Sequence, residues 1–210
     1  ARMLASAARP VIVIGGGIKN SMAHEDALKL AETLNTPICT APGHGDAIPF
    51  GHPLNAGQMG PRGNRVASRL VREADVILAL GTRLGFNSTF YSYDNINAEA
   101  AIIQVEIEPT AIGRYFPVEL GIWGDAAETA RQLTRLIEKA ADRADADAWL
   151  SAYAAEKAAF LKQRDADADM SLPIQPSGLF RTCRRVFPAD AIITIDAGTP
   201  SQQATDALQY

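Results

Sequence analysis

The sequence predicts an α/β fold in which a doubly wound parallel sheet of about five to six strands is followed by a linker helix and an incomplete second α/β unit. The predicted strands are continuous apolar runs, which suits strands covered on both faces. The order strand, glycine turn, helix repeats along the chain, and this order produces right-handed βαβ units. The first domain is therefore expected to be Rossmann-like.

The first predicted strand covers residues 10–14 and ends in a triple glycine. A helix follows over residues 23–34, because alanines and leucines recur there at the spacing of one helix face. Residues 37–40 are expected to form a short second strand. The next segment, residues 41–61, is rich in glycine, proline and histidine, and we expect it to be irregular.

Residues 64–74 predict a helix with its valines and leucine facing inward, and residues 75–80 predict the third strand. The fourth strand is expected at residues 102–107 and a short fifth at residues 118–122. A helix over residues 126–140 then keeps its alanines, leucine and isoleucine in helical register, and it completes the predicted sheet domain.

From residue 142 the composition changes to alanine and charge, but a helical period continues, which indicates a linker helix on the domain surface. Pro173 and Pro176 mark a boundary. A helix at residues 177–187 and a strand at residues 191–195 then begin a second unit that we expect to be truncated. The predicted parts are residues 1–141 (nucleotide-binding-like domain), 142–172 (linker helix) and 173–210 (truncated second unit).

Composition narrows the class of protein. Hydrophobic residues make up 47% of the chain, charged residues 21%, and the net charge is -4, so nothing indicates binding to nucleic acid or to an anionic membrane. No run approaches the roughly 20 apolar residues of a membrane helix. Cys39 and Cys183 lack metal-type spacing, and we expect free thiols in a reducing cytoplasm. The expected partner is a small-molecule substrate.

In an open parallel sheet, ligands bind at the carboxyl ends of the strands, near the point where the strand order reverses. The strict dinucleotide fingerprint is absent here, since Asn20 replaces its third glycine and Thr40 replaces its acidic residue. The triple glycine is therefore either a phosphate-binding loop or a tight turn. Arg83 either binds a diphosphate or forms a salt bridge.

We predict no catalytic and no metal-binding residue in this chain. His24, His44 and His52 lack the spacing or the acidic companion of a metal or base site, and structural or exposed roles are expected for them. No serine lies in a G-x-S-x-G motif.

Seven segments carry a resemblance to a known family, in the right order and spacing over residues 1 to about 140. They are residues 8–17, 34–38, 48–54, 57–60, 74–84, 104–109 and 124–125. Together they resemble the central domain of thiamine-diphosphate enzymes of the acetolactate synthase type. The resemblance implies a parent of three α/β domains with this one in the middle.

That resemblance implies a carboligase or decarboxylase acting on 2-keto acids, with thiamine diphosphate and Mg²⁺ bound in the full-length parent. The catalytic glutamate and the Gly-Asp-Gly metal motif of the family do not occur here, so the isolated fragment is expected to be inactive. The parent is expected to be a homo-oligomer, a dimer or tetramer, through its other domains. The alternative is a non-catalytic adenine-nucleotide module, such as an ADP or NAD sensor or an electron-transfer flavoprotein-like domain.

The central domain of this family binds FAD, ADP or nothing, depending on the enzyme. The positions that match its nucleotide site are Gly15, Gly16, Gly17, Thr40, Met59, Gly60, Gly81, Thr82, Arg83, Glu106, Ile107 and Asp125. The run after Arg83 departs from that of FAD-containing synthases, which favours ADP or an empty pocket. Gly198 and Thr199 lie where the family touches the thiamine diphosphate.

Overall fold

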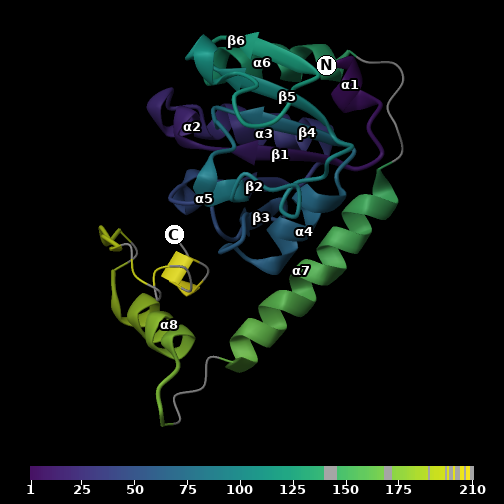
Figure 1. The fold of residues 1–210 in the computed structure, drawn as a ribbon. Coiled ribbons are helices and arrows are strands. Elements are labelled where there is room, and N and C mark those ends of the chain that lie inside the picture. The colour runs from purple at the N-terminus through teal and green to yellow at the C-terminus, as the bar shows by residue number, and fades with distance from the viewer. Residues whose placement is uncertain are drawn as a thin grey trace.

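Six strands form one parallel sheet in the order β3-β2-β1-β4-β5-β6 (Figure 1). The strands are β1 (Pro10–Ile14), β2 (Ile38–Thr40), β3 (Asn55–Gln58), β4 (Val76–Leu80), β5 (Ala101–Glu106) and β6 (Leu120–Trp123). The computed structural model describes residues 1–139, 146–167, 172–188, 190–196, 198, 201, 204–205 and 207–208. The strand order runs outward in both directions from β1 and β4, so the predicted doubly wound sheet is confirmed.

Helices cover both faces of the sheet, which explains the unbroken apolar runs in its central strands β1 and β4. They are α1 (Arg2–Ala5), α2 (Gly16–Asn20), α3 (His24–Leu34), α4 (Arg65–Glu73), α5 (Phe86–Thr89), α6 (Ala126–Glu138), α7 (Asp147–Asp167) and α8 (Pro176–Val186). Along β1, Ile12 and Ile14 pack in the core with α3 and α6, whereas Val11 and Val13 pack in the core with α4 and α7. None of the helices in the described part is long and apolar enough to cross a membrane.

Two strand predictions were wrong. The segment expected to be irregular contains β3, whose sequence Asn-Ala-Gly-Gln has no apolar pattern. It forms because β2 offers a free edge and because the Asn55 amide donates to the carbonyls of Ile48 and Pro49, at 3.1 and 3.2 Å. Residues 191–196 carry no regular structure, and the Ile192 side chain is 96% exposed. That run is apolar enough for a strand, but no described strand lies beside it to accept its hydrogen bonds.

Helix α7 is more than the expected surface linker. It runs obliquely along the sheet domain, and α8 lies beyond its far end (Figure 1). Trp149 and Tyr153 are buried in the core shared with α4, where the Trp149 indole donates to the carbonyl of Pro10 at 3.0 Å. The first half of α7 therefore belongs to the sheet domain, while the predicted boundary at residues 141–142 lies outside the described residues.

Lys157 gives α7 a pH-dependent contact. Its ammonium donates to the carbonyls of His52 and Pro53, at 2.8 and 3.2 Å, and burial lowers its pKa from 10.5 to about 8. Between about pH 8 and pH 10 the unfolded chain keeps a proton that the folded chain has released, so the free energy of unfolding should rise with pH. Urea titrations at several pH values check this.

Lys157→Met should flatten the rise of the free energy of unfolding with pH, whereas Lys162→Met, at an exposed position of the same helix, should not. Equal slopes in the two variants would contradict the assignment.

Candidate functional site

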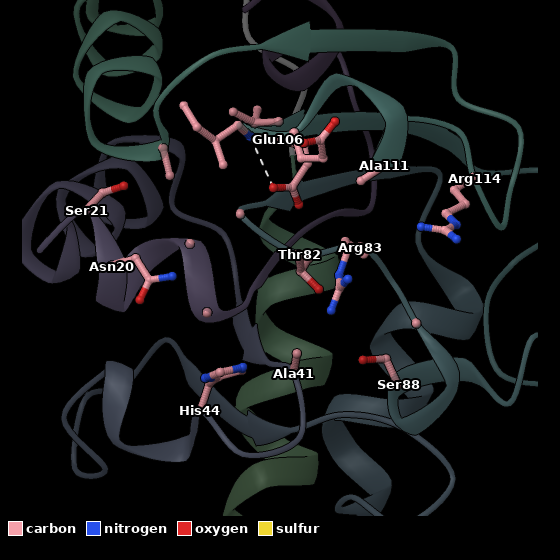
Figure 2. Close-up of a pocket in the computed structure, with 18 of the residues that line it drawn as sticks. Asn20, Ser21, Ala41, His44, Thr82, Arg83, Ser88, Glu106, Ala111 and Arg114 are labelled. Atoms are coloured by element: carbon pink, nitrogen blue, oxygen red, sulfur yellow. Dashed lines mark hydrogen bonds between the residues drawn. The ribbon is translucent and has the colours of Figure 1, made fainter.

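A cavity of about 820 Å³ opens at the carboxyl ends of β1, β4 and β5, where the strand order reverses (Figure 2). Eight of the predicted residues line it: Gly16, Gly17, Gly81, Thr82, Arg83, Glu106, Ile107 and Asp125. Their convergence follows from the parallel register, which places the ends of neighbouring strands at one edge of the sheet.

The remaining predicted residues do not line this cavity. They are Gly15, Thr40, Met59, Gly60 and Gly198. Met59 is fully buried in the core beneath α4, and the buried hydroxyl of Thr40 has no hydrogen-bond partner in the described structure. Gly60 approaches the backbone of Asn87 and Ser88 so closely that a Cβ would lie about 3 Å from their carbonyl oxygens. Thr199 lies outside the described residues.

The backbone of the triple glycine contacts the backbone of the turn that follows β4. Ile14 pairs with Leu80, so the two turns that follow lie side by side. The N–H of Gly17 donates to the carbonyl of Gly81 at 2.9 Å, and a Cβ on Gly17 would lie 2.6 Å from the Cα of Gly81. The tight-turn interpretation thus accounts for Gly17. The same holds for Gly15, whose N–H donates to Leu80 at 3.3 Å.

Gly16 is the exception in this turn. Its N–H donates to no acceptor in the part of the chain that the structure describes, and the residue lines the cavity. Of the three glycines, therefore, Gly16 alone retains a backbone donor for a phosphate oxygen.

Arg83 projects into the middle of the cavity (Figure 2). Its exposed guanidinium forms no ion pair with any described residue, so the salt-bridge interpretation finds no partner there. The Gln104 amide donates to the carbonyl of Thr82, the residue before Arg83, at 3.3 Å and to the carbonyl of Ala111 at 3.2 Å. These bonds tie the loop after β5 to the turn that carries Arg83. A second guanidinium, that of Arg114, also lines the cavity and lies over the Tyr115 ring.

Three carboxylates form the acidic part of the lining, those of Glu106, Glu108 and Asp125. Glu106 accepts the N–H of Ile107 at 3.1 Å through one oxygen, which leaves the other oxygen without a bond in the described structure. Asp125 caps α6 by accepting the N–H of Glu128, and the Ser21 hydroxyl donates to its second oxygen at 2.6 Å. The Ser21 hydrogen bond and then the Glu128 N–H lower the pKa of Asp125. Glu106 is thus better placed than Asp125 to accept a ligand hydroxyl.

His44 is a lining residue that the sequence analysis missed, since a structural or exposed role was expected. Its Nδ1 is buried without a hydrogen-bond partner among the described residues. Burial and the positive charge of Lys19 lower its pKa, against the opposing effect of Asp46. An unpartnered buried nitrogen beside a cavity fits a ligand that completes its hydrogen bonding.

Further polar residues of the lining were also missed, among them Asn20, Ser21, Ser88 and Arg114. Each lies on a loop or in a short helix, and no sequence motif marks it. The lining offers the guanidinium groups of Arg83 and Arg114 together with the open carboxylate oxygen of Glu106, which suits an anionic ligand bearing hydroxyl groups. No group of three or more His, Cys, Asp or Glu that could bind a metal ion occurs among the described residues.

Comparison with known proteins identifies the family to which the chain is similar. The central-domain model of thiamine pyrophosphate enzymes matches residues 1–133. The chain is 38% identical to the sulfoacetaldehyde acetyltransferase of Rhodobacter capsulatus, across 94% of the chain and 37% of that protein. It is 31% identical to a probable acetolactate synthase large subunit of Methanococcus aeolicus, across 94% of the chain and 34% of that protein. The chain thus spans just over a third of the length of the curated relatives it matches.

Proposed function

Since this chain belongs to the thiamine pyrophosphate enzymes and carries their central domain, we propose that the whole protein is a thiamine-diphosphate-dependent transferase or lyase acting on 2-keto acids. The match to the family over residues 1–133 is the observation that carries this proposal. An acetyl unit is common to the names of both groups of relatives, and we propose it as the transferred group, with pyruvate as its donor.

The cofactor supplies the reactive carbanion, and Mg²⁺ is proposed to hold its diphosphate. Both are proposed to bind mainly in the other domains of the whole protein, with Gly198 and Thr199 of this chain beside the thiamine diphosphate. We also propose that the whole protein is a homodimer or homotetramer. None of the relatives named above is a nucleotide sensor or an electron-transfer protein, so the non-catalytic alternative gains no support.

The role proposed for this chain is to bind an adenine nucleotide, with ADP favoured over FAD, in the cavity at the strand ends. Three groups support the fit because none of them has a partner among the described residues: the guanidinium of Arg83, the Nδ1 of His44 and the N–H of Gly16. Arg83 would hold the diphosphate, and the open oxygen of Glu106 would accept a ribose hydroxyl.

We predict that the 210-residue chain does not turn over pyruvate when thiamine diphosphate and Mg²⁺ are supplied, because it lacks the Gly-Asp-Gly motif of the family. The measurement is pyruvate consumption, alone and with sulfoacetaldehyde as acceptor. The whole protein should consume pyruvate under the same conditions. Thiamine-dependent turnover by the chain itself would contradict this division of roles, and a whole protein inert toward every 2-keto acid would contradict the proposed function.

Replacing Arg83 with alanine should weaken ADP binding by roughly ten- to a hundredfold. The substitution removes a charge-assisted contact that contributes about 1.5–3 kcal/mol. Titration calorimetry with ADP and with FAD checks this, and Arg72→Ala on α4, an exposed residue away from the cavity, is the matched control. If neither nucleotide binds at millimolar concentration, the chain belongs with the family members whose pocket is empty.

A further inference from the structure

A second hollow of about 300 Å³ lies between α7 and α8, and the residues that line it are separate from those of the first cavity. Three arginines of α8 line it: Arg181, Arg184 and Arg185. Because they stand three and four positions apart, their side chains share one face of the helix. Three like charges on one helix face repel one another unless negative charge lies among them.

Only part of this positive charge is compensated within the described structure. Asp165 pairs with Arg181 at 2.6 Å, but the same carboxylate also pairs with Arg164 at 2.9 Å. Arg184 donates to the carbonyls of Phe187 and Pro188, at 3.2 and 2.6 Å, and these acceptors are neutral.

Among the described residues, Arg185 donates to the hydroxyl of Thr182, at 3.1 Å. Neither Arg184 nor Arg185 has a carboxylate partner among the described residues, so the described lining of the hollow carries an excess of about two positive charges.

We propose that this hollow is an anion site for a tetrahedral oxyanion of about two negative charges, namely phosphate or a small phosphate monoester. Planar guanidinium groups match the geometry of phosphate oxygens and can bind them in pairs. The volume corresponds to roughly ten water molecules of the liquid, so an organic group attached to the phosphate would also fit. The site is independent of the proposed nucleotide cavity.

The first test titrates the 210-residue chain with inorganic phosphate and follows the Nε–H signals of its arginines by NMR. Phosphate should shift the signals of Arg181, Arg184 and Arg185, and Arg185→Ala should weaken binding about tenfold. The control Arg135→Ala, at an exposed position of α6, should bind as the original chain does. A second titration uses glycerol phosphate. Tighter binding of glycerol phosphate than of inorganic phosphate would identify a monoester as the ligand, and the reverse order would identify the free ion.

Two results would overturn the proposal. One is a shift of the arginine signals by chloride equal to that by phosphate at matched ionic strength, because such a shift would come from ionic screening and not from a specific site. The other is unchanged phosphate binding in Arg185→Ala. Arg83→Ala should leave these shifts intact, and their loss in that variant would assign the phosphate to the first cavity instead.

Asp165→Asn is expected to strengthen phosphate binding, and a misfolded variant would not show such a gain. The substitution removes the carboxylate that competes with phosphate for Arg181 and repels the incoming anion. Phosphate should therefore bind about tenfold more tightly, since one charge-assisted contact becomes available. Weaker or unchanged binding in this variant would contradict the proposed site.

Discussion

Replacing Gly17 with alanine should lower the free energy of unfolding by about 3 kcal/mol or more, because the new methyl group would collide with backbone. Its Cβ would lie 2.6 Å from the Cα and 3.0 Å from the carbonyl oxygen of Gly81. Neither turn can retreat, because β1 and β4 are paired over five residues in the middle of the sheet. Gly81→Ala should cost at least as much, since Gly81 also has a φ of +63°.

Urea denaturation of the single variants measures these costs, and two other glycines supply controls. A Cβ on Gly51 or on Gly43 would meet nothing within 4 Å, but Gly43 has a φ of +86°. Gly51→Ala should therefore be nearly neutral, and Gly43→Ala should show the conformational cost alone, about 1 kcal/mol. If Gly17→Ala is as stable as Gly51→Ala, the close contact between the two turns does not exist in solution.

The strands that the sequence predicts well are those that lie inside the sheet. In β1 and β4 every residue is buried, so an unbroken apolar run is sufficient to identify them, and the run of β5 is interrupted only by Gln104 before the strand ends at Glu106. The edge strand β3 has no such run, and the side chains of Asn55 and Asn64 bond to the backbone around it. Residues 191–195 are the converse case, because an apolar run is no strand without a neighbour to pair with. An apolar run in the sequence indicates that a segment is buried, whereas its pairing as a strand depends on whether a neighbouring strand is present.

The candidate site divides in the same way. Residues at strand ends, such as Arg83 and Glu106, could be predicted because parallel strands bring their carboxyl ends together. His44 could not, since its position depends on the path of a loop that contains no periodic pattern. One signal was available in β5, where Gln104 is polar within a buried strand. Its amide bonds to Thr82, Ala111 and Gly113, and thereby shapes one wall of the cavity.

Replacing Tyr153 with alanine should lower the free energy of unfolding of the sheet domain by about 3–5 kcal/mol. The Tyr153 side chain is 1% exposed, and its hydroxyl donates to the carbonyl of Pro53 at 2.8 Å. Alanine would leave a cavity in the core and would remove one of the two hydrogen bonds to the Pro53 carbonyl, which keeps only the longer bond from Lys157, at 3.2 Å. Tyr153→Phe, which removes only the hydroxyl, should cost about 1 kcal/mol.

Denaturant unfolding followed by Trp fluorescence and by far-UV circular dichroism measures both costs, with Lys162→Ala on the exposed side of α7 as the control. The result decides what α7 is. A helix that only connects two domains could lose one aromatic side chain with little effect on the sheet. If Tyr153→Ala unfolds at the same urea concentration as Lys162→Ala, α7 is such a connector. The loss we expect would instead make α7 the second covering helix on the α4 face, which completes the core that contains Val11, Cys39 and Ile77.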